Sequence, residues 1–466
     1  MEKNSKNQEN LVLQEGLPLS EEQTEEIIEE IQELLDSDEQ PAALEIFSQL
    51  RPGDQSEVIE ELSLESQQEI LISIPPDEAA EIIEHLQPEE VVKVTEGVDT
   101  AVLSDILDAA DSDVQADIIR HLPDEKAEDV LEEMEEAALV TQLLQYSDDS
   151  AGGRMVLEYV VVRQNATTTD ALNALRQNEP EVEDIHSIFV VDSQGKLTGE
   201  ISVSRLALSR PNTRIKRIMD TEITYVTSDT PQEECVRVME RYSLNHLPVV
   251  DEEQRLVGVI NSEDILKVIE EEATEDMYRL AGIPGERIFG PLLLSIRNRL
   301  PWLSLNLVTT FLAALVISIF ESTIARVVTL AVFLPVVAGQ GGIGGTQTLT
   351  LVVRGIALGE ISKRGGLRLL GREISLGILH GVILGIIVGL VAYIWKGNYM
   401  LGAILALAMI GNMFIAGLTG AGIPILLTRL RIDPALASAV LVTTCTDVIG
   451  FLLFLGLAAM LVSHLL

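Results

Sequence analysis

Cysteine, histidine and aromatic residues are scarce in this chain of 466 residues. There are two cysteines, Cys235 and Cys445, and six histidines, and only 4% of the residues are aromatic. Two cysteines cannot build a disulfide framework or a thiolate metal site, and the histidines form no recognisable catalytic constellation, so we do not expect an enzyme. No long apolar run lies near Met1, so no cleavable signal is predicted and the front of the chain is expected to stay in the cytoplasm.

Basic residues are also few, and they are unevenly distributed. The 73 acidic and 32 basic side chains give a net charge of −41, which excludes a general nucleic-acid binder because a phosphate backbone would be repelled. From Ile296 onward there are 5 acids and 11 bases, whereas the preceding residues hold 68 acids and 21 bases. An acidic front piece of charge −47 therefore precedes a hydrophobic back piece of charge +6. At roughly 150 residues per domain, the length suggests about three modules.

Five apolar stretches follow Arg299, and each is long enough to cross a hydrocarbon core of about 30 Å as a helix. They are predicted at 301–320, 324–353, 374–395, 399–427 and 435–465. The basic residues that set the orientation fall on one side if the N-terminus is cytoplasmic and the C-terminus is outside. These residues are Arg297, Arg299, Arg354, Lys363, Arg364, Arg368, Arg372, Arg429 and Arg431. We therefore expect a multi-pass protein of the plasma (inner) membrane.

The second stretch contains five glycines between Pro335 and Thr348. They permit either close helix contact or locally unwound backbone, which lipid tolerates only against protein or a watery cavity. Gln340, Thr346, Gln347 and Thr348 favour a polar lining, because lipid-facing amides would lack partners.

The fifth stretch opens at Asp433 and carries Asp447 near its middle. A carboxylate at that depth costs several kcal/mol unless it meets water, a cation or a proton. Thr444 and Thr443 precede Asp447 by three and four residues and so share its helical face. These groups offer only hard oxygen ligands, the type preferred by Mg²⁺ and Ca²⁺. The alternative is a protonated Asp447 satisfied by the neighbouring threonines.

The front piece begins with a predicted amphipathic helix over 21–37, with Ser20 and Gln23 placed as a capping box. A twelve-residue repeat of apolar positions follows, several of them succeeded by proline or an acid. These positions are Leu50, Leu62, Ile74, Leu86, Val98, Ala110, Leu122 and Met134. Each unit is interpreted as one short helix ended by a turn, and stacked units predict a helical solenoid.

A second, longer repeat follows, with copies 59 residues apart. In each copy an apolar run ends in Asp, at Asp192 and Asp251, and a glycine follows seven positions later, at Gly199 and Gly258. The pattern predicts a hairpin docked on helices. It resembles a tandem pair of CBS domains, which often bind adenine nucleotides such as ATP. The family's ribose-contacting acid matches Asp264 in the second copy, but Arg205 occupies that place in the first.

An acidic segment lies between this repeat and the apolar stretches. On a helix, Glu272, Glu275 and Asp276 share one face, where like charges destabilise each other. The simple interpretation is a solvated acidic face. Its position next to the spans and the −47 surplus favour a functional role.

In this order, the features resemble the MgtE family of magnesium channels from about Ser20 to the end. The most specific pieces are 272–276, Asp433-Pro-Ala435 and Thr444-Cys-Thr-Asp447-Val448. The resemblance implies a multi-domain α-helical membrane protein with a cytosolic all-α helical-repeat domain, an α/β tandem CBS domain and five transmembrane helices. The expected domains are a flexible tail at 1–19, helical repeats at 20–148, CBS domains at 149–214 and 215–270, a linker (plug) helix at 271–298 and a transmembrane pore domain at 299–466.

The resemblance also implies a homodimer whose pore runs along the two-fold axis and takes up Mg²⁺. Asp447 would be the selectivity carboxylate and Asp433 the acid at the cytoplasmic end of the span; the other expected pore positions are Thr443, Thr444, Gln347, Gly341 and Gly342. Cytosolic Mg²⁺ would close the pore by filling sensor sites between the acidic domains. The matching ligands are the carbonyl of Gly153 and the acids Glu233, Asp264, Glu272, Glu275 and Asp276.

The sequence departs from the family pattern at four positions. Lys267, Pro231 and Ser243 stand where family members can have acids, so fewer or weaker sensor ions are expected. Ile343 replaces an Asn of the glycine-rich second span, although Gln347 is retained.

Two other functions remain open at this level. Asp447 could be protonated alternately, as in a proton- or sodium-coupled divalent cation exchanger with broader selectivity for Co²⁺ or Mn²⁺. A membrane-tethered nucleotide sensor without transport is a third class, but it leaves Asp447 without a purpose.

Overall fold

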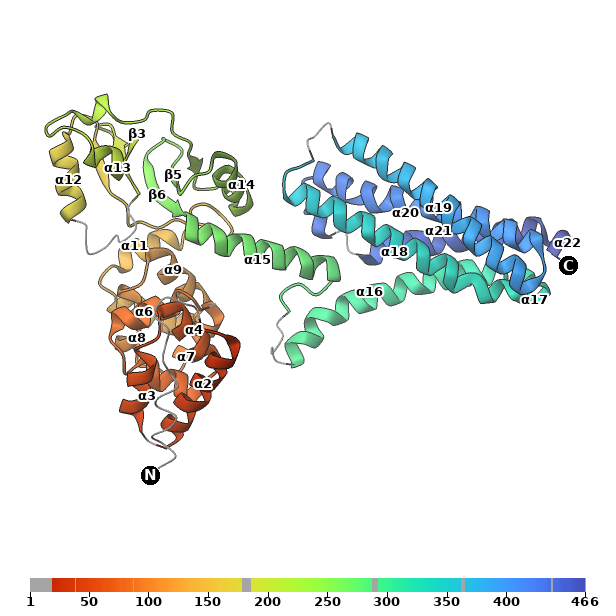
Figure 1. Cartoon of the computed structure of the whole chain (residues 1–466), viewed down its shortest axis with the longest axis horizontal. Helices are drawn as coiled ribbons and strands as arrows, with labels where there is room; N and C mark the ends of the chain where they lie inside the picture. Colours follow the sequence, from red (N-terminus) through yellow and green to blue (C-terminus); the bar gives the residue numbers. More distant parts are fainter. Residues whose placement is uncertain are drawn as a thin grey trace. The chain divides into compact units, whose positions relative to one another are not determined.

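The computed structural model describes residues 19–37, 39–86, 88–177, 186–286, 292–361, 365–436 and 439–465. It forms two compact units, Met1–Ile265 and Leu266–Leu466, which are described separately below (Figure 1). Apart from Leu19, the tail predicted at 1–19 lies outside the described residues, as do Lys363 and Arg364 of the predicted basic loop. Helical repeats, two α/β repeats and five long apolar helices follow one another along the chain, which confirms the predicted fold class.

The first unit starts with ten helices in the described residues up to Leu143. They are α2 (Glu21–Asp36), α3 (Gln40–Phe47), α4 (Pro52–Glu61), α5 (Leu64–Leu71), α6 (Pro76–Ile83), α7 (Pro88–Thr95), α8 (Thr100–Asp108), α9 (Ser112–His121), α10 (Asp124–Glu133) and α11 (Ala137–Leu143). The start of α2 is held as predicted, because the Ser20 backbone N–H donates to Gln23 Oε1 at 3.1 Å.

The twelve-residue repeat is confirmed as one helix and one turn per unit. Contacts join each helix to the helix two places along the chain, so α4, α6, α8 and α10 form one row and α5, α7, α9 and α11 form another. The repeat positions Leu50, Leu62, Leu86, Ala110, Leu122 and Met134 are buried at the turns. Because one short helix cannot bury its apolar side alone, this stacking creates the predicted solenoid; we call it the helical-repeat domain.

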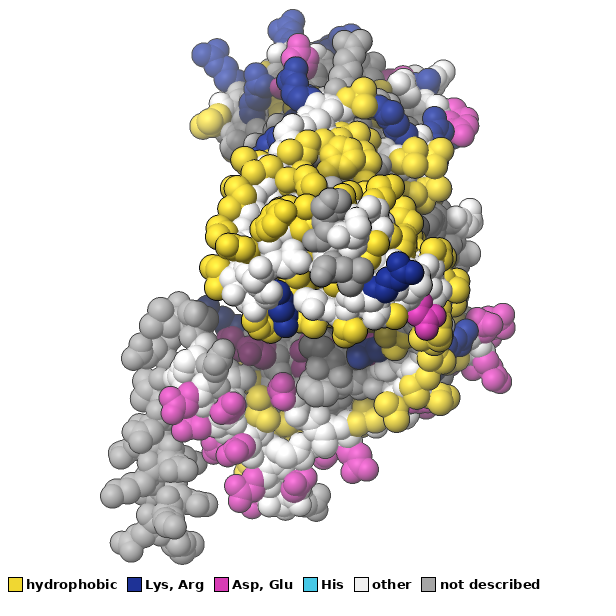
Figure 2. Space-filling view, turned by 90° about the vertical axis from the view of Figure 1, so that its right-hand side faces the viewer, with side chains coloured by type: hydrophobic (Ala, Val, Ile, Leu, Met, Phe, Trp, Pro, Cys, Tyr) yellow, Lys and Arg dark blue, Asp and Glu magenta, His cyan; other side chains and the backbone are white. Residues whose placement is uncertain are grey.

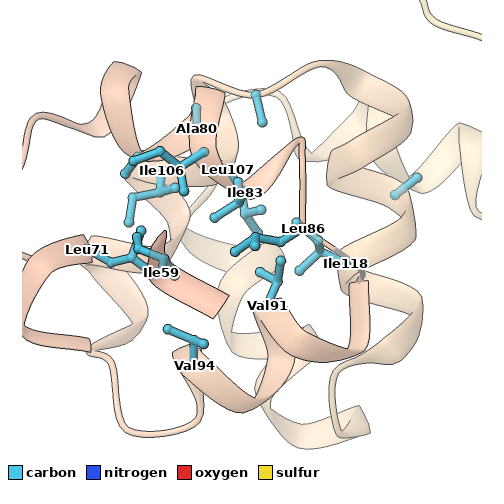
Figure 3. Packing of buried hydrophobic residues seen from close by; sticks show 14 of the residues in the cluster. Ile59, Leu71, Ala80, Ile83, Leu86, Val91, Val94, Ile106, Leu107 and Ile118 are labelled. Carbon is cyan, nitrogen blue, oxygen red and sulfur yellow. The ribbon is translucent and has the colours of Figure 1, made fainter. Parts of the chain in front are cut away.

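The core of the helical-repeat domain lies between the two rows. Figure 3 shows Ile59, Ile83 and Leu107 converging from α4, α6 and α8, with Ile118 of α9 close by. All four side chains are at most 2% exposed. Burying such a side chain stabilises the fold by about 1.5–3 kcal/mol.

Two α/β repeats complete the first unit. The first contains β1 (Val161–Arg163), α12 (Thr168–Gln177), β2 (Ser187–Val191), β3 (Leu197–Ser202), α13 (Val203–Ala207) and the 3₁₀ turn η1 (Ile215–Arg217). The second contains β4 (Val226–Thr227), α14 (Gln232–Tyr242), β5 (His246–Val250) and β6 (Leu256–Asn261), and continues into α15 (Ser262–Ala281). In each sheet the first strand pairs with the second in parallel, as β1 does with β2 and β4 with β5. The second and third strands, β2 with β3 and β5 with β6, form the predicted antiparallel hairpin.

The two α/β repeats pair with one another through equivalent backbone groups. The Leu197 N–H donates to the Gln254 carbonyl at 3.0 Å, and the Leu256 N–H donates to the Gly195 carbonyl at 3.3 Å. Leu197 and Leu256 are 59 residues apart, as are Gly195 and Gln254. The sequence repeat is therefore also an approximate two-fold relation in the fold.

The second unit contains the five helices that are long and apolar enough to cross a membrane. They are α16 (Leu292–Ile319), α18 (Thr329–Ala357), α19 (Gly366–Lys396), α20 (Tyr399–Arg429) and α21 (Ala439–Met460), accompanied by the short α17 (Glu321–Arg326), η2 (Pro434–Leu436) and α22 (Val462–Leu465). The predicted number of spans is confirmed, but α16 starts nine residues before the predicted 301, because Pro301 is accommodated inside the helix. Figure 2 shows hydrophobic side chains over much of the surface of these helices.

Glycine lets α19 and α20 pack backbone against backbone. Gly377, Gly381, Gly385 and Gly389 recur every four residues along α19. A Cβ at Gly381 would lie 2.7 Å from Ile410 Cα, and one at Gly385 would lie 2.8 Å from the Ala406 carbonyl oxygen. Small residues at this spacing allow the close approach that holds helices together in lipid.

The helix predicted over 271–298 is instead divided between two helices. α15 begins at Ser262, directly after β6, and ends at Ala281, and α16 begins at Leu292. Gly282 adopts a φ of 72°, and the Ile283 N–H donates to the Tyr278 carbonyl at 2.9 Å. This Schellman-type ending stops α15, because glycine enters the left-handed region without a steric penalty.

Candidate functional site

A groove of about 980 Å³ runs along α18 and α21 within the second unit. It is lined by Ala338, Gly339, Gly342, Ile343, Thr346, Gln347, Thr350, Leu351, Arg354, Thr443 and Asp447. Ile343, Gln347, Thr350 and Arg354 lie on one exposed side of α18. Hydroxyl, amide and carboxylate groups on one open face of an apolar helix bundle would lack partners in lipid. This face therefore suits water, a cation or another protein surface.

Asp447 and Thr443 stand on the same wall of the groove. Thr443 lies one turn before Asp447 on α21. Its hydroxyl donates to the Ala439 carbonyl at 2.8 Å, so its oxygen keeps lone pairs for an incoming donor or cation. The hydroxyl of Thr444 donates to the Val440 carbonyl at 2.6 Å, but Thr444 is not among the groove-lining residues.

Glycine brings the two walls of the groove together. A Cβ at Gly342 of α18 would lie 3.3 Å from Thr443 Cγ2, and one at Gly345 would lie 2.5 Å from Val442 Cγ1. α18 is continuous through Pro335 and all five glycines. Of the two alternatives for these glycines, the structure shows close helix contact rather than unwound backbone. The predicted Gln347 and Gly342 thus join Asp447 and Thr443 in one groove.

Gly341 lies on a different side of α18, against a residue that sequence reasoning missed. Asn412 of α20 is fully buried, and its Nδ2 donates to the Val337 carbonyl at 2.7 Å. Its amide lies between Gly341 and Gly450, and no described residue partners its Oδ1. Asn412 holds α18 against α20 and α21; a buried amide in an apolar span is the signal that could have revealed it.

Asp433 does not line the groove but pairs with the end of α15. Its Oδ2 lies 2.5 Å from a guanidinium nitrogen of Arg279, and its Oδ1 accepts from the Ala435 N–H at 2.8 Å. Arg279 also pairs with Glu275, one turn earlier on α15. Leu280 packs beside them against Leu349, Val353, Ala435 and Val442. The end of α15 is therefore attached to the start of the fifth span.

The predicted sensor ligands fall in both units. In the first, Gly153 is buried in a turn where a Cβ would collide with the Ser147 carbonyl, Glu233 is exposed in the first turn of α14, and Asp264 lies in the first turn of α15. In the second, Glu272, Glu275 and Asp276 follow along α15. No three Asp, Glu, His or Cys side chains within the described ranges are arranged as a ready-made metal site.

A cluster of acids that sequence reasoning missed lies in the first unit, between the helical-repeat domain and the second α/β repeat. Asp111 lies at the surface and is exposed, but partial desolvation by the surrounding protein, followed by the charges of Glu84, Asp113, Glu158 and Glu263, raises the pKa of its carboxyl to about 7. The Asp111 N–H donates to Glu84 Oε1 at 3.1 Å, and Glu158 Oε2 accepts from the Ser112 hydroxyl at 2.8 Å. These five acids form what we call the acidic cluster, and Asp264 follows Glu263 directly. Concentrated negative charge of this kind attracts a divalent cation.

Comparison with known families gives matches over most of the chain. Residues 334–457 match the MgtE family, described as a divalent cation transporter. Residues 24–112 and 50–149 match the MgtE intracellular N domain, and residues 153–209 and 215–271 match the CBS domain.

Individual relatives cover more than two thirds of both chains. The chain is 38% identical over 330 residues to the magnesium transporter MgtE of Thermus thermophilus, spanning 70% of this chain and 73% of that one. It is 34% identical over 331 residues to the magnesium transporter MgtE of Bacillus subtilis, spanning 71% of this chain and 73% of that one. Among solved structures, the cytosolic domain of the Mg²⁺ channel MgtE in complex with ATP matches at 35% identity and a TM-score of 0.49, covering 52% of this chain and 99% of that chain.

Proposed function

The chain belongs to the MgtE family of transporters, and from this premise we propose that it is a Mg²⁺-selective channel of the plasma (inner) membrane that is closed by cytosolic Mg²⁺. The N-terminus is cytoplasmic and the C-terminus is outside. The observation that carries this function is the groove between α18 and α21, a largely apolar groove on whose walls Asp447, Thr443 and Gln347 stand. A carboxylate in an apolar span is energetically costly, and a passing cation compensates this cost.

A second copy of the chain completes the pore. The groove is open on the side of α18 that carries Gln347 and Thr350, and lipid cannot satisfy these groups. Two copies related by a two-fold axis bring two such grooves together and enclose a passage onto which these polar groups face. The homodimer thus places two Asp447 carboxylates around one path.

Two carboxylates at this point select by charge and hydration. Mg²⁺ gives up its water reluctantly, so Asp447 and the Thr443 oxygen hold a largely hydrated ion through its bound water molecules. Double charge favours Mg²⁺ over monovalent cations, and anions are repelled. The inside-negative potential draws in a divalent ion with about 4.6 kcal/mol per 100 mV.

Closure follows from the acidic surface of the cytosolic unit. The surplus of 47 negative charges makes two copies repel one another, and Mg²⁺ bound at Glu233, Asp264, Glu272, Glu275, Asp276 and the Gly153 carbonyl removes the repulsion. The acidic cluster around Asp111 adds negative charge at the helical-repeat domain that Mg²⁺ screens. α15 then moves as one piece with the residues that it contacts, Asp433 among them. Several weak sites jointly supply the roughly 5.5 kcal/mol that a nearly complete open-to-closed shift requires.

Divalent-ion flux into liposomes, titrated with Mg²⁺ on the cytosolic side, tests this function. We expect Mg²⁺ influx that falls cooperatively as cytosolic Mg²⁺ rises, and a current that reverses at the Mg²⁺ equilibrium potential. A requirement for a proton or Na⁺ gradient would establish the exchanger instead. If no divalent ion passes under either condition, the chain is not a transporter, and the remaining candidate function is a membrane-tethered nucleotide sensor.

We also propose that the pair of α/β repeats binds ATP. Asp264 of the second repeat has Arg205 as its counterpart 59 residues earlier, so only one half of the pair offers an acid to a ribose. Calorimetric titration of the full-length protein should give one nucleotide per chain, and Asp264→Asn should weaken it at least tenfold. Two equal sites, or none, would contradict this assignment.

A further inference from the structure

The first α/β repeat carries a run of positive charge within an otherwise acidic front piece. Residues 201–219 contain five bases and no acid, whereas the whole chain has a net charge of −41. The five are Arg205, Arg210, Arg214, Lys216 and Arg217, and all are exposed.

The fold places four of these bases, Arg210, Arg214, Lys216 and Arg217, beside the end of the edge strand β1, and Arg205 precedes them on α13. The Thr168 hydroxyl donates to the Arg210 carbonyl at 3.0 Å, the Thr168 N–H donates to the Thr213 carbonyl at 2.9 Å, and the Ile215 N–H donates to the Ala166 carbonyl at 2.9 Å. The segment 210–217 is thereby tied to the segment that follows β1, whose last residue is the exposed Arg163. None of the six bases forms an ion pair with any residue that the structure describes. We call this surface the basic face.

A large apolar side chain projects from the basic face. Leu208 follows α13 between Arg205 and Arg210, and it is 89% exposed, the largest exposed fraction among the described large hydrophobic side chains. A single exposed leucine needs no explanation by itself. Flanked by arginines, it matches the composition of surfaces that lie on a bilayer, where bases contact headgroups and an apolar side chain enters the acyl boundary.

We propose that the basic face binds the anionic headgroups of the membrane in which this chain is itself anchored. Clusters of four to eight Lys and Arg near a cytoplasmic leaflet are drawn to its negative surface potential. The basic face and the five apolar helices belong to one chain, so covalent linkage keeps the bilayer surface at a high effective concentration for this face. An acidic protein surface would satisfy the bases but would leave Leu208 in water, so the bilayer is the occupant that uses both features.

Hydrogen exchange of the full-length protein in lipid nanodiscs tests this docking. Peptides covering 203–217 are followed in nanodiscs of phosphatidylcholine alone, in nanodiscs with 30% phosphatidylglycerol, and in detergent, all with EDTA. We expect exchange to slow severalfold only with phosphatidylglycerol, and 0.5 M NaCl to abolish the protection because the Debye length then falls to a few Å. Leu208→Ser should reduce the protection in anionic nanodiscs alone.

A charge-matched pair of variants separates docking from a general charge effect. Arg210→Gln with Arg214→Gln should weaken the docking equilibrium about twenty-five-fold, at about fivefold per base. Arg237→Gln with Arg241→Gln on α14 removes the same charge elsewhere and should leave protection intact.

Three results would overturn the proposal. Equal protection in detergent would mean that the segment is covered by protein, either a second copy or the acidic residues at 178–185, which lie outside the described residues. Equal protection in both nanodiscs would remove the role of lipid charge. Fast exchange in all three media would show that nothing covers the face.

Discussion

Arg279 of α15 and Asp433 at the start of the fifth span form an ion pair, with 2.5 Å between guanidinium nitrogen and carboxylate oxygen. The two residues are 154 positions apart. The carboxylate that the family resemblance assigns to the cytoplasmic end of the pore is thus occupied by a cation of the chain itself. A passing Mg²⁺ and the end of α15 would compete for the same oxygen atoms.

Removing Arg279 should favour the open channel. Arg279→Gln leaves Asp433 without its internal cation and detaches α15, so the Mg²⁺ concentration that half-closes the channel should rise severalfold. Single-channel recording with Mg²⁺ titrated on the cytosolic side measures it. Arg326→Gln on α17 removes the same charge elsewhere and should close like the unaltered protein. Identical titrations for all three proteins would exclude a gating role for the ion pair.

Asp447 should determine selectivity. Asp447→Ala removes the carboxylate from the groove and should lower Mg²⁺ flux at least tenfold, or abolish its preference over Na⁺, while the dimer still forms. Flux into liposomes and size-exclusion chromatography with light scattering give the two readouts. Glu321→Gln on α17 serves as the control. Selective Mg²⁺ flux in correctly inserted Asp447→Ala would refute the assignment.

The acids of α15 should carry the response to cytosolic Mg²⁺. Replacing Glu272, Glu275 and Asp276 together by Ala removes both the repulsion and its relief by Mg²⁺, so flux should lose its dependence on cytosolic Mg²⁺, and protection of α15 from protease by Mg²⁺ should vanish. Three exposed acids of α10, Glu128, Glu132 and Glu133, provide a charge-matched control. If protection and flux of the unaltered protein ignore Mg²⁺ up to tens of millimolar, the acidic face is only solvated.

Gly341 should tolerate no larger side chain. A Cβ there would overlap the buried amide of Asn412, whereas a Cβ at Gly339, two residues earlier, meets nothing within 4 Å. Gly341→Ala should therefore lower the free energy of unfolding by about 1–3 kcal/mol. Gly339→Ala should be neutral or slightly stabilising, since alanine favours a helix. Thermal unfolding in detergent compares the two, and equal midpoints would contradict the packing described for Asn412.

Asp111 should make the cytosolic unit more stable in mild acid. Its pKa is raised from 3.8 to about 7, first by partial desolvation and then by the surrounding acids, and because Asp111 is exposed, solvent screening reduces the effect on stability. Between these values the folded state binds more protons than the unfolded state, so stability falls as pH rises through this window, and the full penalty is present above pH 7. In Mg²⁺-free buffer the unfolding midpoint should drop from pH 5.5 to pH 8, by about 2–4 °C for each kcal/mol lost.

Two variants isolate the contribution of Asp111. Asp111→Asn should flatten the pH dependence and reduce the stabilisation by added Mg²⁺, because the amide carries no charge. Glu132→Gln, an exposed acid of α10, should change neither. An unchanged pH slope in Asp111→Asn would show that other acids cause it.

The features that were predicted correctly from the sequence are those that depend on the local periodicity of the chain. The twelve-residue repeat from Leu50 to Met134, the hairpins after Asp192 and Asp251, and the five apolar lengths each follow from residues that are neighbours along the chain. The alignment of Thr443 with Asp447 follows from helical spacing in the same way.

The features that sequence analysis missed depend on contacts between distant segments. Arg279 meets Asp433, Asn412 meets Val337 75 positions away, and Asp111 faces Glu158, and no spacing rule relates these pairs. The boundary of α15 was missed for another reason. Its start at Ser262 follows directly from β6, and its end depends on the left-handed conformation of Gly282.

The contact between α19 and α20 has a mechanical consequence. Where backbone touches backbone over four successive glycine turns, neither helix can slide or tilt without separating carbonyls and Cα atoms that no side chain cushions. We therefore expect α19 and α20 to remain fixed relative to one another. α18 also touches α20 through backbone, at Gly345 and Gly420, so we expect any motion that opens or narrows the proposed pore to occur chiefly in α21 and α15.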